Sequence, residues 1–189
     1  SLDRDMLAAY GEFRLEAERM GFHHFLELFY PNAPGHVPGK PAGSRPADVA
    51  RFLADHVTRA LAGVPRAGRP LFLKIPYLGP AVMEQLAAYD STLIVGVLGG
   101  SAGTTHDAFG LVAESKRHGA RVALFGRKIN AAEHQPTFVK YLRLVADGHA
   151  SAEEAVRAYH AELEGLGIRP HRSLATDLAR SPSAMAYRG

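Results

Sequence analysis

Two kinds of hydrophobic pattern alternate along this chain. Short runs that are continuously apolar and often β-branched are separated by longer segments in which apolar residues recur at helical spacing. Runs of the first kind are typical of strands covered on both faces in a parallel sheet. The alternation therefore predicts an α/β fold built from parallel strand-to-helix (βα) units. Its strands are expected near residues 23–29, 71–76, 93–98 and 121–125.

The predicted helices have recognisable ends. Thr104 or Thr105 can cap a helix that a cationic turn and Gly119 end, and Ser151 with Glu154 forms a capping signature. Helices are expected over residues 2–20, 46–64, 79–90, 105–118, 135–146 and 151–166.

Two consecutive predicted strands end in glycine turns. The strand near 93–98 runs into GGSAG at residues 99–103, and the strand near 121–125 runs into Gly126 and Arg127. The carboxyl ends of neighbouring parallel strands are where α/β proteins hold anionic ligands. The pattern therefore predicts a site for an anionic small molecule at this edge of the sheet.

Four consecutive (βα) units would make half of an eight-stranded barrel. A doubly wound open sheet is the other arrangement, but GGSAG lacks the G-x-G-x-x-G spacing that dinucleotide binding needs. Half a barrel leaves two strand edges and one apolar face without partners. We therefore expect that the chain is a fragment of a longer chain or that two copies associate as a homo-oligomer.

Composition narrows the picture. The 189 residues, 47% of them hydrophobic and 22% charged, suit one globular domain. The net charge of +3 is spread along the chain, which favours anionic small molecules over nucleic acid. Periodicity fades near the end, so we assign residues 1–168 to the (βα) portion and residues 169–189 to an extended or mobile tail.

Metals and membranes are not indicated. The chain has no cysteine, and its ten histidines show no metal-ligand spacing, so neither a metal nor another cofactor is expected. His106 follows the glycine turn near the start of a predicted helix and could contact a ligand there, but a solvent-exposed helix position is the favoured interpretation. No signal peptide is visible and no apolar run approaches the roughly 20 residues that span a bilayer, so we expect a cytoplasmic protein.

The last three predicted strands and their turns resemble a known family. The order LFLKIPYLGP, VGVLGGSAGTTHDAF, HGARVALFGRKIN and FVKYLRLVADG is similar to the end of the barrel in class I aldolases of the archaeal fructose-bisphosphate, deoxyribose-phosphate and tagatose-bisphosphate aldolase superfamily. The resemblance covers residues 22–148 and implies the C-terminal half of a TIM barrel. In this family a lysine on the sixth strand forms a Schiff base, and the turns after the last two strands bind phosphate.

The resemblance implies a phosphate site in the two glycine turns. Gly99, Gly100 and Ser101 would offer backbone donors, and Gly126 with Arg127 would add a second turn and a forked charge. The other interpretation is structural: the glycines form a tight turn, and Arg127 forms a salt bridge at the barrel rim.

The resemblance also implies catalytic roles. Pro76 occupies the position of the family's usual nucleophile, and Lys74, two residues earlier, shares its face of the strand. Lys74 is therefore either the Schiff-base residue or a lysine paired with an acid such as Glu27. Glu27 resembles the glutamate on the fifth strand of the tagatose-bisphosphate branch and would move the substrate proton, with Tyr30 behind it.

These observations predict a lyase that makes or breaks a carbon–carbon bond in a phosphorylated sugar or keto acid. The alternative is a non-catalytic protein that binds sugar phosphates or acts as a scaffold, and Pro76 favours it.

Overall fold

A computed structural model describes residues 2–30, 46–100 and 103–181 of the chain. Its elements are, in order, α1 (Leu2–Arg19), β1 (Leu26–Glu27), α2 (Pro46–Leu61), the short 3₁₀ helix η2 (Arg66–Gly68), β2 (Phe72–Ile75), α3 (Pro80–Tyr89), β3 (Ile94–Leu98), α4 (Thr105–Arg117), β4 (Val122–Leu124), α5 (Arg127–Asn130), α6 (Gln135–Asp147), α7 (Ala152–Gly165) and α8 (Leu174–Leu178).

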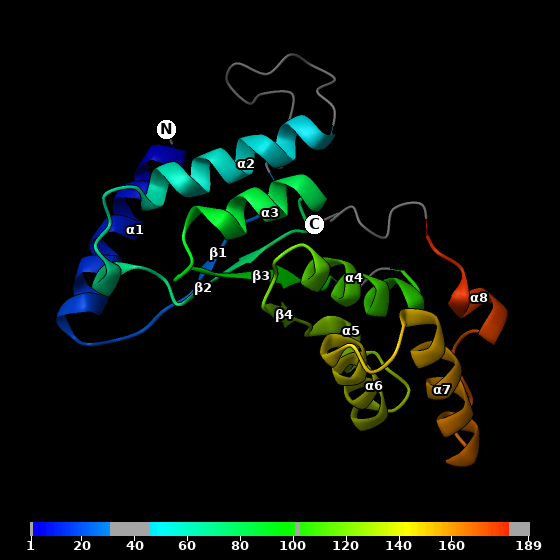
Figure 1. Cartoon of the computed structure of the whole chain (residues 1–189). Helices are drawn as coiled ribbons and strands as arrows, with labels where there is room; N and C mark the ends of the chain where they lie inside the picture. The colour runs from blue at the N-terminus through cyan, green and yellow to red at the C-terminus, as the bar shows by residue number, and fades with distance from the viewer. Residues whose placement is uncertain (1, 31–45, 101–102, 182–189) are drawn as a thin grey trace.

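The four strands form one parallel sheet in the order β1-β2-β3-β4, so each strand pairs with the next strand along the chain. The connecting helices α2 and α3 pack on the same face of this sheet (Figure 1). Sequential order with the connections on one face lacks the reversal of strand order at which doubly wound sheets bind ligands. The predicted α/β fold with parallel strands is confirmed.

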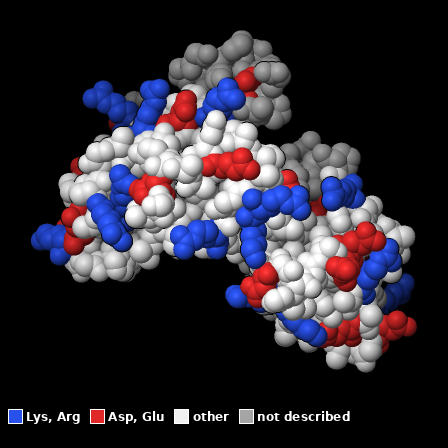
Figure 2. Space-filling view, in the orientation of Figure 1, with Lys and Arg blue, Asp and Glu red and all other residues white. Residues whose placement is uncertain are grey.

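The helix-covered face of the sheet holds the first apolar cluster. Leu73 and Ile75 of β2, with Val95 and Val97 of β3, are at most 1% exposed and pack against α2 and α3. On the opposite face, Lys74 of β2 is only partly buried. On the side seen in Figure 2 the surface is hollowed beneath the sheet, and charges of both signs are interspersed over it.

A second apolar cluster joins α4, α6 and α7. Phe109 of α4, Phe138 of α6 and Tyr159 of α7 are at most 1% exposed, and their rings are in contact. Leu111 belongs to the first cluster, so α4 ties the sheet layer to the C-terminal helices. The predicted helices are confirmed, with small differences at their ends, and Thr104 and Ser151 both form capping boxes.

The first strand is shorter than predicted. Only Leu26–Glu27 pairs with β2, although the run FHHFLELF predicted a strand over residues 23–29. The backbone oxygen of His24 accepts the N–H of Leu71 at 2.8 Å, and its side chain lies beside α1, with Nε2 3.2 Å from the hydroxyl of Tyr10. Phe22, the first residue of the run, is exposed and does not pair in the sheet.

The segment after residue 168 is not simply extended, which corrects the predicted tail. Ser173 accepts a hydrogen bond from the N–H of Thr176 and caps α8, and Asp177 of α8 is only 2% exposed. A five-residue helix is too short to leave a periodic pattern, which is why the sequence did not reveal it. Residues 182–189 lie outside the described residues.

Candidate functional site

One row of residues crosses the open face of the sheet. Glu27 of β1 is in register with Lys74 of β2, Lys74 with Gly96 of β3, and Gly96 with Val122 of β4. Residues in register on parallel strands project from the same face, so the two charged side chains meet. Lys74 Nζ lies 2.7 Å from Glu27 Oε1, with the side chains 25% and 32% exposed. The predicted pairing of Lys74 with an acid is therefore present.

Gly96 lies beside Lys74 in the sheet and is tightly packed by its neighbours. A Cβ atom at this position would lie 2.5 Å from the backbone oxygen of Leu73 and 3.3 Å from Val122 Cβ, so the sheet has no room for a side chain there. The sequence analysis did not single out Gly96. A glycine inside an otherwise β-branched strand is the signal that could have identified it.

A cavity of about 260 Å³ opens at the carboxyl ends of the strands. It brings together both residues of the ion pair and both glycine turns. Its lining includes six of the predicted site residues: Glu27, Lys74, Gly99, Gly100, Gly126 and Arg127. Ser101, also predicted to bind phosphate, lies outside the described residues. A larger cavity of about 650 Å³ runs between β4 and α6 and also reaches Lys74.

The cavity carries a net positive charge. Lys74 and Glu27 neutralise each other, whereas Arg127 is exposed and has no carboxylate within ion-pairing distance among residues 2–30, 46–100 and 103–181. The rim salt bridge considered for Arg127 is therefore absent from the described part of the chain. One unpaired guanidinium at the cavity suits an anionic group, because its forked donors match carboxylate and phosphate oxygens.

The two glycines of the first turn differ in what they offer. The N–H of Gly99 already donates to Leu124 O at 2.9 Å, and a Cβ atom at Gly99 would overlap the ring of Phe125. Gly99 is thus required for packing, and its amide is not available to a ligand. Gly100 has φ +62°, a left-handed conformation that favours glycine, and it remains the better candidate donor.

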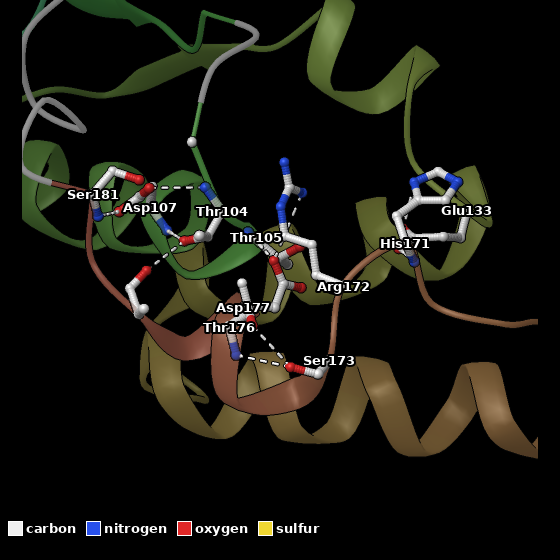
Figure 3. Close-up of polar contacts among 12 residues, drawn as sticks. Thr104, Thr105, Asp107, Glu133, His171, Arg172, Ser173, Thr176, Asp177 and Ser181 are labelled. Atoms are coloured by element: carbon white, nitrogen blue, oxygen red, sulfur yellow. Dashed lines mark hydrogen bonds and ion pairs between the residues drawn. The ribbon is translucent and has the colours of Figure 1, made fainter.

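The first amides of α4 have acceptors within the protein. Asp107 accepts from the N–H of Thr104, and Asp177 accepts from the N–H of Thr105, both at 2.8 Å (Figure 3). Two carboxylates therefore occupy the positive end of this helix dipole. These two amides are therefore not available to a ligand anion.

Tyr30 does not join the site. Leu26, Leu28 and Tyr30 pack against the cluster on the helix-covered face, while Glu27 and Phe29 line the cavity. The hydroxyl of Tyr30 donates to Tyr77 O at 3.4 Å, and burial raises the pKa of Tyr30. The period of two along an extended segment could have excluded Tyr30, because it stands an odd number of residues from Glu27.

Two further side chains differ from expectation. His106 is only 7% exposed, although solvent exposure was predicted, because the side of α4 that carries it is covered. Lys128, which the sequence did not single out, is 8% exposed and donates to Gly103 O at 2.7 Å. Burial lowers the pKa of Lys128, and the nearby Arg172 lowers it further. A lysine in a turn gives no sequence signal of such burial.

Neither the family models nor the curated proteins compared with this sequence match it. Within the described ranges, no group of three or more histidine and acidic side chains is placed to hold a metal ion. In the same part of the chain, none of the helices combines the length and apolarity needed to cross a bilayer.

Proposed function

We propose that this chain forms half of a class I aldolase-like (βα)-barrel, and that its cavity makes or breaks a carbon–carbon bond in a phosphorylated sugar or keto acid. The observation that carries the proposal is the cavity itself. Lysine, glutamate, two glycine turns and an unpaired arginine come from four different strands or the turns after them and line one space of about 260 Å³. Sequential strand order and an open sheet face are what half a barrel requires.

Lys74 would supply the nucleophile. Only the unprotonated amine attacks a carbonyl, so the ammonium proton has to leave first, and Glu27 Oε1 lies 2.7 Å away to receive it. Addition to the substrate carbonyl gives a carbinolamine, and Glu27 returns the proton to its hydroxyl, which leaves as water to give an iminium and restores the Glu27 carboxylate. The electrons of the breaking carbon–carbon bond flow to this iminium, while the proton of the adjacent hydroxyl passes to a base, for which Glu27 is the candidate.

Arg127 and the turns would hold the phosphate. The Arg127 guanidinium offers two parallel donors, and Gly100 and Gly126 bring the backbone close to the same space. The larger cavity beside β4 gives the rest of the substrate an apolar wall that includes Leu124, Ile129 and Leu142. The proposed partner is therefore a phosphorylated small molecule.

A second function has its own support. Pro76 stands where the resembling family carries its nucleophile, and the ion pair of Lys74 with Glu27 requires the ammonium form of the lysine. Both features suit a protein that binds a sugar phosphate without forming a Schiff base.

Borohydride trapping separates the two functions. The full chain is incubated with dihydroxyacetone phosphate and borohydride, and intact mass is measured. We expect one covalent adduct that is absent in Lys74→Met and retained in Lys140→Met, a control lysine whose partner Glu162 lies on the surface of α7. Phosphate binding without an adduct in the unmodified chain would establish the non-catalytic function, and an adduct on Lys128 or Lys140 would refute the assignment of Lys74.

A further inference from the structure

The segment Ser173–Ser181, here called the C-terminal clasp, is bonded to the start of α4 (Figure 3). Asp177 Oδ1 accepts the N–H of Thr105 at 2.8 Å. The hydroxyl of Thr104 donates to Ala179 O at 2.9 Å, and the N–H of Ser181 donates to Asp107 Oδ1 at 3.1 Å. Three hydrogen bonds thus join the clasp to the residues that directly follow the first glycine turn.

Asp177 is the centre of this contact. Its second oxygen, Oδ2, lies 2.9 Å from His160 Nε2, and Arg172 Nη1 is 4.0 Å from Oδ1. Burial alone would raise the pKa of this carboxyl, but hydrogen bonds from the Thr105 amide and His160 hold the pKa below its ordinary value. The side chain is therefore a buried carboxylate at the positive end of α4, where the helix dipole favours it.

The same turn is held from a second side. Lys128 Nζ, from α5, donates to the backbone oxygen of Gly103, the residue before Thr104. Gly103 to Thr105 therefore lie between two buried charged side chains, Lys128 and Asp177. Both oxygens of the Asp177 carboxylate have partners, Thr105 and His160, so another arrangement of this contact would leave a buried charge without them.

We propose that Asp177 is a positioning residue that, through the N–H of Thr105, fixes Gly103 to Thr105, where the turn after β3 enters α4. The residue does not line the cavity itself and so does not touch the ligand. The expected effect on phosphate affinity rests on the proposed function. The expected effect on the backbone at the start of α4 does not depend on that function.

The test uses the full chain and the variant Asp177→Asn, which keeps the shape and one acceptor but removes the charge. The control is Asp147→Asn, which removes a carboxylate from an exposed pair with Arg143. Amide hydrogen exchange is measured without ligand at residues 103–107 and, as an internal reference, within α7. Binding of inorganic phosphate is measured by titration under conditions in which all variants are folded.

We expect exchange at residues 103–107 to rise at least tenfold in Asp177→Asn relative to α7, and phosphate affinity to fall about fivefold or more, which corresponds to about 1 kcal/mol. The Asp147→Asn control should change neither. His160→Gln removes a partner of the Asp177 carboxylate without removing the carboxylate itself. If Asp177→Asn does not fold, His160→Gln should show a smaller rise in exchange at residues 103–107 relative to α7.

An unchanged ratio of exchange between the turn and α7 would overturn the inference, as would faster exchange accompanied by undiminished phosphate affinity. In a chain that binds no phosphate at all, the proposed phosphate site fails. The exchange ratio then decides alone whether Asp177 fixes the turn.

Discussion

The two faces of the same four-stranded sheet have opposite chemistry. On one face, Ile75 and Val97 are fully buried under α2 and α3, and no polar strand residue interrupts the apolar surface between them. On the other, the neighbouring position Lys74 forms an ion pair with Glu27, and both side chains are partly exposed. Alternation along each strand produces both surfaces from one sequence. One face accounts for stability and the other remains available for a ligand.

The largest effect is expected where the covered face is disrupted. Ile75→Ala should lower the free energy of unfolding by about 2–5 kcal/mol, because it removes buried methyl groups and leaves a cavity. Lys74→Met, one residue away on the open face, should change it by about 1 kcal/mol or less, since a partly exposed ion pair contributes little. Urea denaturation of both variants measures the difference. Equal losses would mean that the two faces are not distinct.

The next effect concerns the ligand. Arg127→Ala should weaken binding of a sugar phosphate by about 1.5–3 kcal/mol, the usual value of a hydrogen bond to a charged group. Arg157→Ala on α7, which breaks an exposed pair with Glu153, is the matched control and should leave binding unchanged. Calorimetric titration with dihydroxyacetone phosphate gives the affinities. If Arg127→Ala binds as well as the unmodified chain, the anion site must be placed elsewhere.

The smallest effect is expected at Val122, which is partly buried on the open face. Val122→Ala should cost about 1 kcal/mol or less, because only part of its apolar area is removed from water. A cost as large as that of Ile75→Ala would show that something covers the open face in solution. Light scattering would then distinguish a second copy, which doubles the mass of 20.4 kDa, from a single chain whose open face is covered in another way.

The sequence predicted the sheet better than its edges. Strands β2, β3 and β4 were predicted because their runs are continuously apolar, although the pattern suggested cover on both faces and α2 and α3 pack on only one. The first strand was overestimated because the run FHHFLELF is largely apolar, whereas only Leu26–Glu27 pairs in register with β2, and apolarity was the signal used. A local sequence pattern cannot distinguish an edge strand from a run of exposed aromatic residues, because the distinction depends on whether an adjacent strand is present to pair with.

The candidate site shows the same limit. Glu27, Lys74 and Arg127 were predicted from turn chemistry and resemblance, and the cavity contains all three. Asp177 and Lys128 could not be predicted, because their burial depends on contacts between segments far apart in the sequence. Period-two alternation was sufficient to exclude Tyr30, but the residues after β1 were treated as loop.

The C-terminal clasp also has a consequence for the order of folding. Each strand of the sheet pairs with the next strand along the chain, whereas the hydrogen bond between Thr105 and Asp177 joins residues 72 positions apart. Closing a longer loop costs more chain entropy, so contacts between sequence neighbours form sooner. We therefore expect the sheet to assemble before the clasp closes. In a chain emerging from the ribosome, the strands would pair before the hydrogen bond between Asp177 and the start of α4 forms. The cavity would therefore be the last part of the molecule to reach its final structure.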